Sequence, residues 1–164
     1  MNGDESGKPQ VTLRDPAALI ATWFGAGLLP GAPGTWGSLA ALPFGWALQL
    51  AGGPVALAAG AALVFALGTW ATGRLIGGSL GSDPGLVVVD EVVGQWLVLL
   101  VVPLDPFLYA AAFLVFRLFD ILKPWPVSWA DRAVKGAFGV MLDDVLAGIY
   151  GAALLSTLAW WIGS

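Results

Sequence analysis

The chain has 164 residues, of which 58% are apolar and only 11% are charged, and its formal net charge is −4. Soluble domains carry about 25% charged residues, so this composition, with a mean hydropathy of +0.83, predicts an integral membrane protein of one domain and no nucleic-acid partner. The chain contains neither cysteine nor histidine, which excludes disulfides, thiolate or imidazole nucleophiles and soft metal sites. Any chemistry must therefore use carboxylates, lysine, arginine, hydroxyls and backbone amides.

The first 16 residues are polar and mixed in charge, so we predict a flexible cytoplasmic tail at 1–16 and one membrane-embedded domain at 17–164. Within that domain, apolar runs occupy residues 17–29, 36–51, 54–73, 92–102, 107–119 and 145–163. Only 54–73 and 145–163 approach the ~20 residues that a helix needs to cross a bilayer. The first run is short and lies among glycines, so we expect an interfacial helix there.

Two tight turns join four of these runs into pairs. Gly52, Gly53 and Pro54 link the second run to the third, and the sequence PLDP at 103–106 links the fourth to the fifth. The predicted fold is therefore an all-α integral membrane bundle of two helical hairpins plus a C-terminal transmembrane helix, with a short N-terminal interfacial helix.

The basic residues indicate how this bundle is oriented. A hairpin returns the chain to the side that it left, so the tail and the segments 25–38, 74–91 and 120–144 should share one side of the membrane. All seven basic residues fall on that side: Lys8, Arg14, Arg74, Arg117, Lys123, Arg132 and Lys135. Basic residues favour the cytoplasmic side, so we expect a multi-pass protein whose charged segments face the cytoplasm.

Two acidic pairs share one layout. VVVDEVVG at 87–94 and VMLDDVLAG at 140–148 each place two adjacent carboxylates ahead of a glycine. Each pair is expected to open a helix, and Gly94 and Gly148 would let the two helices approach closely. Four carboxylates share a site only when a cation neutralises them, and oxygen ligands suit Mg²⁺, with Mn²⁺ as a substitute. The predicted metal ligands are Asp90, Glu91, Asp143 and Asp144; the alternative is ordinary stabilisation of helix N-termini by acidic residues.

A second cluster lies in FRLFDILKPWPVSWADRAVKG at 116–136. Arg117, Asp120 and Lys123 are spaced i, i+3, i+6 and share roughly one helix face, which Pro124 should end. Charges within an apolar run are rare and usually functional. We therefore predict that Arg117, Lys123 or Arg132 holds a phosphate beside the metal. The alternative is a basic juxtamembrane stretch that anchors the chain to anionic lipid.

A third element is the loop GAGLLPGAPGTWGS at 25–38, which holds five glycines and two prolines. Such a loop can turn backbone N–H groups toward an anion. Thr35 or Ser38 is expected to cap the helix that follows, and Gly34, Thr35 and Ser38 are candidate phosphate-binding residues. The alternative is a flexible turn before a membrane hairpin.

Four stretches together resemble the phosphatidylglycerophosphatase A family: GAGLLPGAPGTWGSLAALP, VVDEVVGQW, FRLFDILKPWP and VMLDDVLAG, in this order. The resemblance covers the chain from about Trp23 onward. It implies an all-α, Mg²⁺-dependent enzyme of the bacterial inner membrane. Such an enzyme removes the terminal phosphate of phosphatidylglycerophosphate and yields phosphatidylglycerol, the precursor of cardiolipin.

On this interpretation the site has three sets of residues. The catalytic residues are Asp90, Glu91, Asp120, Asp143 and Asp144; the metal ligands are Asp90, Glu91, Asp143 and Asp144; the phosphate-binding residues are Arg117, Lys123, Arg132, Gly34, Thr35 and Ser38. The nucleophile is either a metal-activated water or a carboxylate.

Two other classes of protein would also keep charges within apolar segments. A transporter or channel would place them near the bilayer midplane, whereas here they crowd one surface. A non-enzymatic scaffold for anionic lipids would need the basic cluster but not the four carboxylates.

Overall fold

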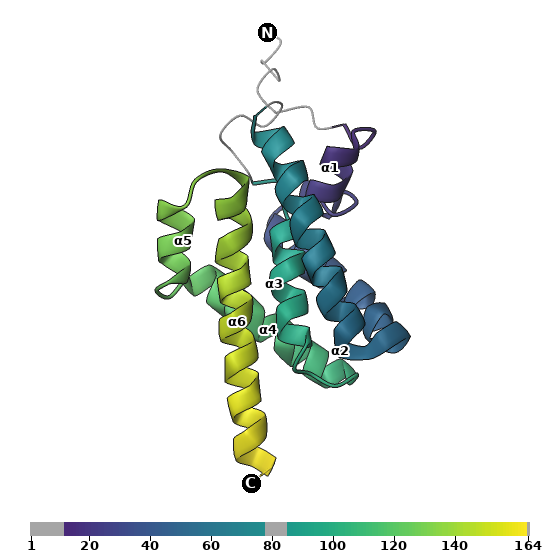
Figure 1. The fold of residues 1–164 in the computed structure, drawn as a ribbon, viewed down its shortest axis with the longest axis vertical. Helices are drawn as coiled ribbons and strands as arrows, with labels where there is room; N and C mark the ends of the chain where they lie inside the picture. Colours follow the sequence, from purple (N-terminus) through teal and green to yellow (C-terminus); the bar gives the residue numbers. More distant parts are fainter. Residues whose placement is uncertain (1–11, 78–84, 164) are drawn as a thin grey trace.

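A computed structural model describes residues 12–77 and 85–163. Over these residues the chain is helical and contains no strand, which confirms the all-α prediction (Figure 1). The elements are α1 (Pro16–Ala21), the 3-10 helix η1 (Ala26–Leu28), α2 (Pro33–Ile76), α3 (Val89–Leu99), α4 (Pro106–Leu122), α5 (Val127–Ala133) and α6 (Gly136–Gly163). Most of the predicted tail lies outside the described residues.

Two helices, α2 and α6, are long and apolar enough to cross a membrane, judged by length and composition. Together with the composition of the chain, they identify a membrane protein. The number of full crossings and the interfacial placement of the N-terminal segment stay predictions. Trp160 and Trp161, near the end of α6, are 70% and 74% exposed, as expected for aromatic side chains at a membrane surface.

Helix α2 is broken where the first turn was predicted. Gly52 and Gly53 have non-helical backbone angles, and the φ of +65° at Gly53 favours glycine. The chain changes direction sharply at this point, at the lower right of Figure 1. The two parts of α2 pack against each other beyond the break: a Cβ added to Gly60 would lie 2.8 Å from Cδ1 of Leu48. We call these parts the N-terminal half (33–51) and the C-terminal half (54–76).

Helix α3 forms the centre of the bundle and is buried along nearly its whole length. The indole Nε1 of Trp96 donates to the backbone oxygen of Ala41 over 2.9 Å, which ties α3 to the N-terminal half of α2. At 11 residues, α3 is about 16 Å long and too short to cross a bilayer.

Helices α3 and α6 cross at the two glycines singled out by the sequence. A Cβ on Gly148 would lie 2.5 Å from the backbone oxygen and 3.1 Å from the Cα of Gly94. The predicted close approach is therefore confirmed. It sets the acidic turn of α3 beside the acidic turn of α6.

This crossing predicts that Gly148→Ala destabilises the protein, because the added methyl has no room between two backbones. Overpacking of this kind typically costs about 1–3 kcal/mol. Gly73→Ala is the matched control, since the new Cβ would meet its nearest neighbour at an ordinary 3.6 Å. Thermal unfolding in detergent should show a lower midpoint for Gly148→Ala alone. Equal midpoints for the two variants would contradict the tight crossing.

Three predicted helix boundaries were wrong. The run at 17–29 is not one helix: α1 ends at Ala21, and Trp23, Phe24 and Gly25 have positive φ. Helix α2 starts at Pro33, because proline suits the first helical position, and its N-cap is Ala32 instead of Thr35 or Ser38. Helix α6 starts at Gly136, so Asp143 and Asp144 lie two turns inside the helix instead of opening it.

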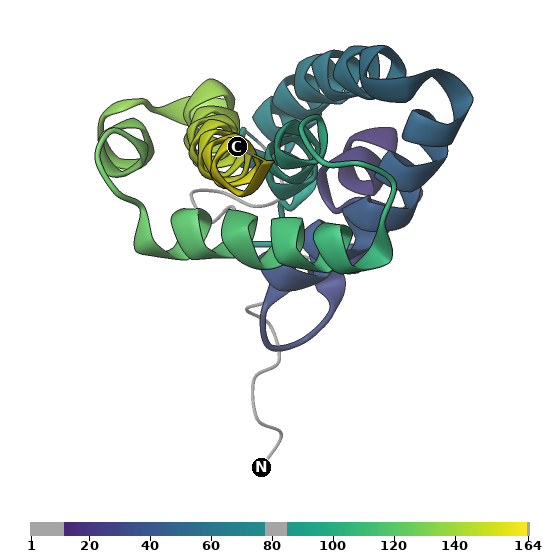
Figure 2. The same cartoon turned by 90° about the horizontal axis from the view of Figure 1, so that it is seen from below.

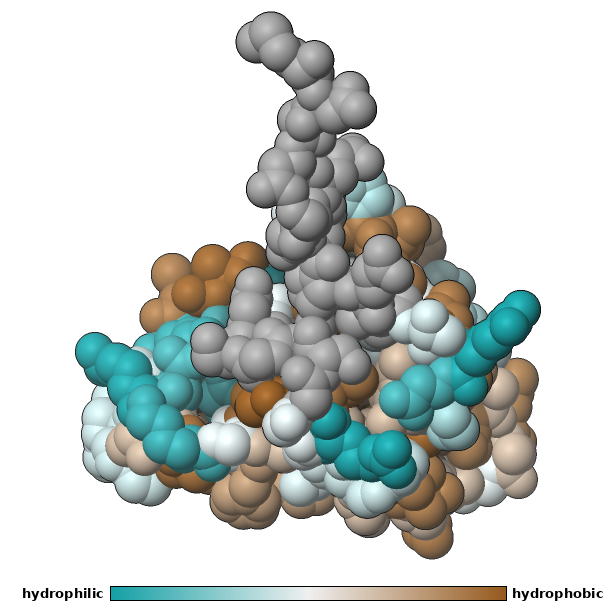
Figure 3. All heavy atoms as spheres, turned by 90° about the horizontal axis from the view of Figure 1, so that it is seen from above, coloured by the Kyte–Doolittle hydropathy of each residue, from teal (hydrophilic) through white to brown (hydrophobic). Residues whose placement is uncertain are grey.

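The ends of the bundle differ in polarity. In Figure 1, α1, α5 and the start of α6 lie at the upper end, and both turns and the end of α6 lie toward the lower end. Seen from above, the upper face carries hydrophilic side chains (Figure 3). Seen from below, α4 runs across one side of the other helices (Figure 2). The C-terminal end of α4 thereby reaches α5 and the upper part of α6.

Candidate active site

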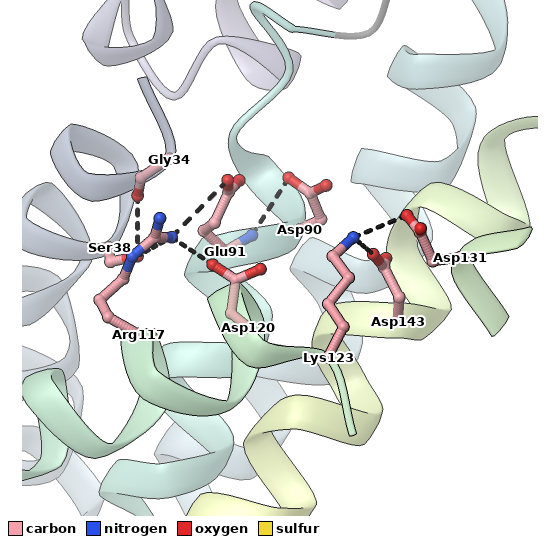
Figure 4. A network of polar contacts seen from close by, with 9 residues as sticks. All are labelled: Gly34, Ser38, Asp90, Glu91, Arg117, Asp120, Lys123, Asp131 and Asp143. Carbon is pink, nitrogen blue, oxygen red and sulfur yellow. Dashed lines mark hydrogen bonds and ion pairs between the residues drawn. The ribbon is translucent and has the colours of Figure 1, made fainter. Parts of the chain in front are cut away.

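A pocket of about 310 Å³ opens near the polar end of the bundle. It is built by segments far apart in sequence: the first turn of α2, the approach to α3, the end of α4, helix α5 and the start of α6. The lining residues are Pro33, Gly34, Gly85, Val87, Asp90, Glu91, Lys123, Asp131, Val140 and Asp143. Figure 4 shows most of the charged groups of this region.

Three carboxylates meet beside this pocket. One oxygen each from Asp90, Glu91 and Asp144 lies within 4.8 Å of the others. Asp90 and Asp144 are only 8% and 3% exposed. They meet because Asp90 and Glu91 occupy the first turn of α3, and the Gly94–Gly148 crossing brings the third turn of α6 alongside. We call these three residues the acidic cluster.

The acidic cluster is electrostatically unfavourable by itself. Burial, together with the charge of Glu91, raises the pKa of Asp90 well above its ordinary value. Burial likewise raises the pKa of Glu91. Each group resists ionisation because its charge would be desolvated next to other negative charges. A divalent cation would remove this penalty.

The donor atoms fit a hard cation. All are carboxylate oxygens, which suit Mg²⁺ or Mn²⁺. Within the described parts of the chain, Oε2 of Glu91 is buried without a hydrogen-bond partner. A buried carboxylate oxygen without a partner is costly. This oxygen is therefore available to coordinate a metal at the expected site.

Arg117 lies at one side of the acidic cluster. Its Nη1 is 2.5 Å from Oδ2 of Asp120 and 3.9 Å from Oε1 of Glu91. The same atom donates to Oγ of Ser38 over 3.3 Å, and Ser38 Oγ donates to the backbone oxygen of Gly34 over 2.8 Å. Arg117 therefore joins α2, α3 and α4 (Figure 4).

Gly34 leaves room for the charged side chains that pack against it. A Cβ at this position would overlap Oε1 of Glu91 and lie 3.0 Å from Nη1 of Arg117. The glycine-rich loop thus brings its backbone directly against the charged groups, as a role beside a phosphate would require.

Lys123 lies at the other side of the acidic cluster (Figure 4). It caps the C-terminus of α4 in the left-handed conformation, with φ of 44°. Its Nζ is 2.6 Å from Oδ1 of Asp131 and 2.7 Å from Oδ2 of Asp143. Burial alone would lower the pKa of Lys123, but these two ion pairs raise it above the ordinary value. Lysine therefore stays charged beside the pocket.

The structure divides the four predicted metal ligands. Asp90, Glu91 and Asp144 form the acidic cluster, whereas Asp143 pairs with Lys123. Adjacent residues point about 100° apart around a helix axis, and on α6 this rotation directs Asp144 toward Asp90 and Glu91 and Asp143 toward Lys123. Asp120 lies between the two groups, with Arg117 on one side and Asp144 close by.

Four of the six predicted phosphate-binding residues are absent from the pocket lining: Arg117, Ser38, Arg132 and Thr35. Arg117 and Ser38 nevertheless belong to the network of charged groups beside the pocket. Arg132 is exposed, and its Nε donates to the backbone oxygen of Ser128 over 3.0 Å. Thr35 is half-buried in the first turn of α2. Conversely, sequence reasoning did not assign Asp131 to the site. Its spacing gave no direct signal, because its partner Lys123 lies on the other side of two prolines.

Residues 19–159 match the phosphatidylglycerophosphatase A family.

The chain belongs to this family.

Two bacterial relatives named phosphatidylglycerophosphatase A are similar to the chain over nearly their whole lengths. The Haemophilus influenzae protein is 38% identical over 154 residues, which cover 93% of this chain and 94% of the relative. The Escherichia coli protein is 37% identical over 149 residues, which cover 90% and 86%. The expectation of an enzyme, a phosphatase of the phosphatidylglycerophosphatase A family, is confirmed.

A third relative, from Bacteroides thetaiotaomicron, is provisionally named phosphatidylinositol-3-phosphatase. It is 45% identical over 158 residues, which cover 88% of this chain and 94% of the relative. No solved structure matches the chain.

Proposed function

We propose that this protein hydrolyses the terminal phosphate of phosphatidylglycerophosphate to give phosphatidylglycerol, and so supplies the precursor of cardiolipin. The observation that carries the proposal is the pairing of the acidic cluster, in which Asp90 and Asp144 are buried and Glu91 is partly buried, with two cations, Arg117 and Lys123, beside one pocket. A phosphate monoester dianion with a bound divalent cation has the charges that such a site complements. The relatives' names supply the lipid.

Asp90, Glu91 and Asp144 would hold Mg²⁺, or Mn²⁺ in its place. When bound there, the metal supplies polarisation of the phosphoryl group and lowers the pKa of a coordinated water. Asp143 serves a different purpose in this proposal, because its ion pair with Lys123 fixes the lysine at the pocket.

Arg117 and Lys123 would bind the phosphate oxygens from two sides. Charge stabilisation is most of what phosphoryl transfer requires from a protein. Hydrolysis breaks the bond between phosphorus and the ester oxygen, and the departing glycerol oxygen takes up a proton. Since the chain has no histidine or cysteine, a carboxylate of the site is the group best suited to move that proton, and Asp120 is our candidate because it adjoins both Arg117 and Asp144. The nucleophile is a water or a carboxylate.

Magnesium dependence is the direct test. Phosphate release from phosphatidylglycerophosphate in mixed micelles should stop with excess EDTA and return with Mg²⁺ or Mn²⁺, because EDTA would remove the metal that the acidic cluster is proposed to hold. Full activity in EDTA would exclude the metal. Phosphatidylinositol 3-phosphate should be tested in parallel, since one relative's name suggests that lipid. The absence of turnover on either lipid would favour the transporter or the scaffold instead.

The proposal also places the pocket at the cytoplasmic face of the bacterial inner membrane, in a multi-pass protein. Its support is the basic residues of the polar end, among them Arg74, Arg132 and Lys135, combined with the preference of basic residues for the cytoplasm.

Cysteine labelling tests this orientation without background, since the chain has no cysteine. Gly77→Cys and Ala133→Cys, both at exposed positions of the polar end, should react with an impermeant maleimide only from the cytoplasm. Ala51→Cys and Leu104→Cys, at the exposed turns of the other end, should react only from outside. Labelling of Gly77→Cys and Ala133→Cys from opposite sides would contradict a single charged face.

A further inference from the structure

A shallow apolar groove of about 400 Å³ lies between the N-terminal half of α2 and the first half of α4. Its lining residues are Leu42, Pro43, Trp46, Pro106, Tyr109 and Ala110. The pocket at the acidic cluster is lined by other residues, so the groove is a separate feature of the surface.

The floor of the groove is held rigidly. The rings of Trp46 and Tyr109 meet edge to face with centroids 4.9 Å apart. The Tyr109 hydroxyl donates to Oε1 of Gln49 over 2.5 Å. The amide nitrogen of Gln49 in turn donates to the backbone oxygens of Leu99 and Val102. The one hydroxyl in the lining is therefore already bonded, and apart from the indole of Trp46 the other lining side chains are purely apolar.

The groove leads directly away from the phosphate-binding side of the site. Arg117 of α4 contacts Ser38 of α2, and these same two helices form the groove walls further along. Leu42 and Trp46 lie one and two turns beyond Ser38, and Ala110 lies two turns before Arg117. At 1.5 Å per residue, the path from Arg117 to Pro106 is at most about 16 Å.

We propose that this groove binds one acyl chain of the phospholipid substrate while Arg117 holds the terminal phosphate end of the same molecule. The inference rests on the proposed function. It concerns the acyl chain, which the pocket beside the acidic cluster does not accommodate. A lipid with its headgroup at the polar end must run its chains toward the opposite end of the bundle, and the groove residues Leu42 and Trp46 lie further along α2 in that direction than Ser38. Because lipid tails already surround the protein, the groove contributes mainly orientation of the substrate and little hydrophobic driving force.

The test compares Ala110→Trp, which fills the groove, with Ala59→Trp, a matched change at an exposed position in the C-terminal half of α2. We expect Ala110→Trp to lower kcat/KM for long-chain phosphatidylglycerophosphate about tenfold, through KM. Turnover of the deacylated headgroup should not change, and Ala59→Trp should match the wild type on both substrates. Equal behaviour of the two variants on the long-chain lipid would overturn the inference.

Photolabelling of the unmodified protein gives an answer that does not depend on turnover or on the folding of a variant. The probe is phosphatidylglycerophosphate with a diazirine midway along one acyl chain, used in nanodiscs with EDTA. Peptides that contain residues 42–46 and 106–110 should be labelled, and excess unlabelled substrate should reduce this labelling. The same chain on phosphatidylcholine should label them less.

The two proposals fail in different ways. Labelling that is uniform over the lipid-facing surface, or insensitive to the headgroup, overturns the acyl groove even if phosphate release is normal. Absence of phosphate release from the wild type overturns the proposed function, whereas headgroup-dependent labelling of the groove would still support lipid binding there.

Discussion

Asp144→Asn is expected to lower kcat on phosphatidylglycerophosphate by at least about 100-fold, the scale of losing one key electrostatic or metal-supporting group. Asp144 is 3% exposed and meets Asp90 and Glu91. Asparagine keeps the shape of the side chain and removes its charge. The loss should therefore report the missing negative charge at the acidic cluster. Asp90→Asn and Glu91→Gln should behave alike. Mn²⁺ binding, followed by electron paramagnetic resonance, should weaken in all three variants.

Asp105→Asn is the matched control. Asp105 is the N-cap of α4, where its Oδ1 accepts from the backbone nitrogens of Phe107 and Leu108, both over 2.9 Å. Asparagine caps helices as well as aspartate does, so kcat should hold. If Asp105→Asn were as damaging as Asp144→Asn, the assignment of the acidic cluster would be wrong.

Asp143→Asn should change KM and Mn²⁺ binding differently from both Asp144→Asn and Asp105→Asn. Asp143 pairs with Lys123 instead of joining the acidic cluster. Its loss should free Lys123 and raise KM while Mn²⁺ binding is largely retained. Loss of Mn²⁺ binding in Asp143→Asn would instead restore the four-carboxylate set predicted from the sequence.

Stabilisation of a helix N-terminus cannot explain the pair at 143–144. The helix dipole acts mainly on the first turn, and α6 begins at Gly136. Asp90 and Glu91 do lie in the first turn of α3, but Asp90 is buried and Glu91 partly buried beside Asp144. Without metal, Asp144→Asn should therefore be at least as stable in detergent as the wild type, because one repelling charge has been removed.

Arg117→Lys is expected to lower kcat/KM by about 2–4 kcal/mol, or roughly 30- to 1000-fold. Nη1 already contacts Ser38, Glu91 and Asp120, and Nε is buried without a partner among the described residues. The planar guanidinium of Arg117 has several N–H donors, so it can keep these contacts and still donate to a phosphate. Lysine retains the charge but cannot reproduce this geometry. The measurement is kcat and KM in mixed micelles.

Two controls separate phosphate binding from other roles of Arg117. Lys135→Ala removes an exposed cation of the polar end and should change membrane association by about 1 kcal/mol without altering kcat. Thermal unfolding in detergent shows whether Arg117→Lys merely disrupts the buried ion pair. Wild-type kcat/KM in Arg117→Lys would mean that the phosphate is held elsewhere, with Lys123 the next candidate.

The sequence by itself determined the helical class, the two breaks and the membrane setting. Apolar runs predict helices through their length and composition, and Gly52–Gly53 and the prolines at 103 and 106 interrupt them locally. The same local logic found the charged residues: Asp90, Glu91, Asp144, Arg117, Asp120 and Lys123 were all identified because charge is costly within an apolar run. Gly94 and Gly148 were identified because only small residues permit close helix approach.

Only the tertiary structure decided how these charges are shared. Adjacent aspartates look equivalent in a sequence, but rotation about the α6 axis turns Asp144 toward Asp90 and Glu91 and Asp143 toward Lys123. The role of Asp131 and the exclusion of Arg132 from the pocket lining depend on how α5 folds back after Pro124 and Pro126, which no local pattern encodes. The groove beside Trp46 and Tyr109 has the same origin, since it exists only where the N-terminal half of α2 and α4 diverge. Local propensities operate over a few residues, whereas ion pairs and pockets form between residues that only packing brings together.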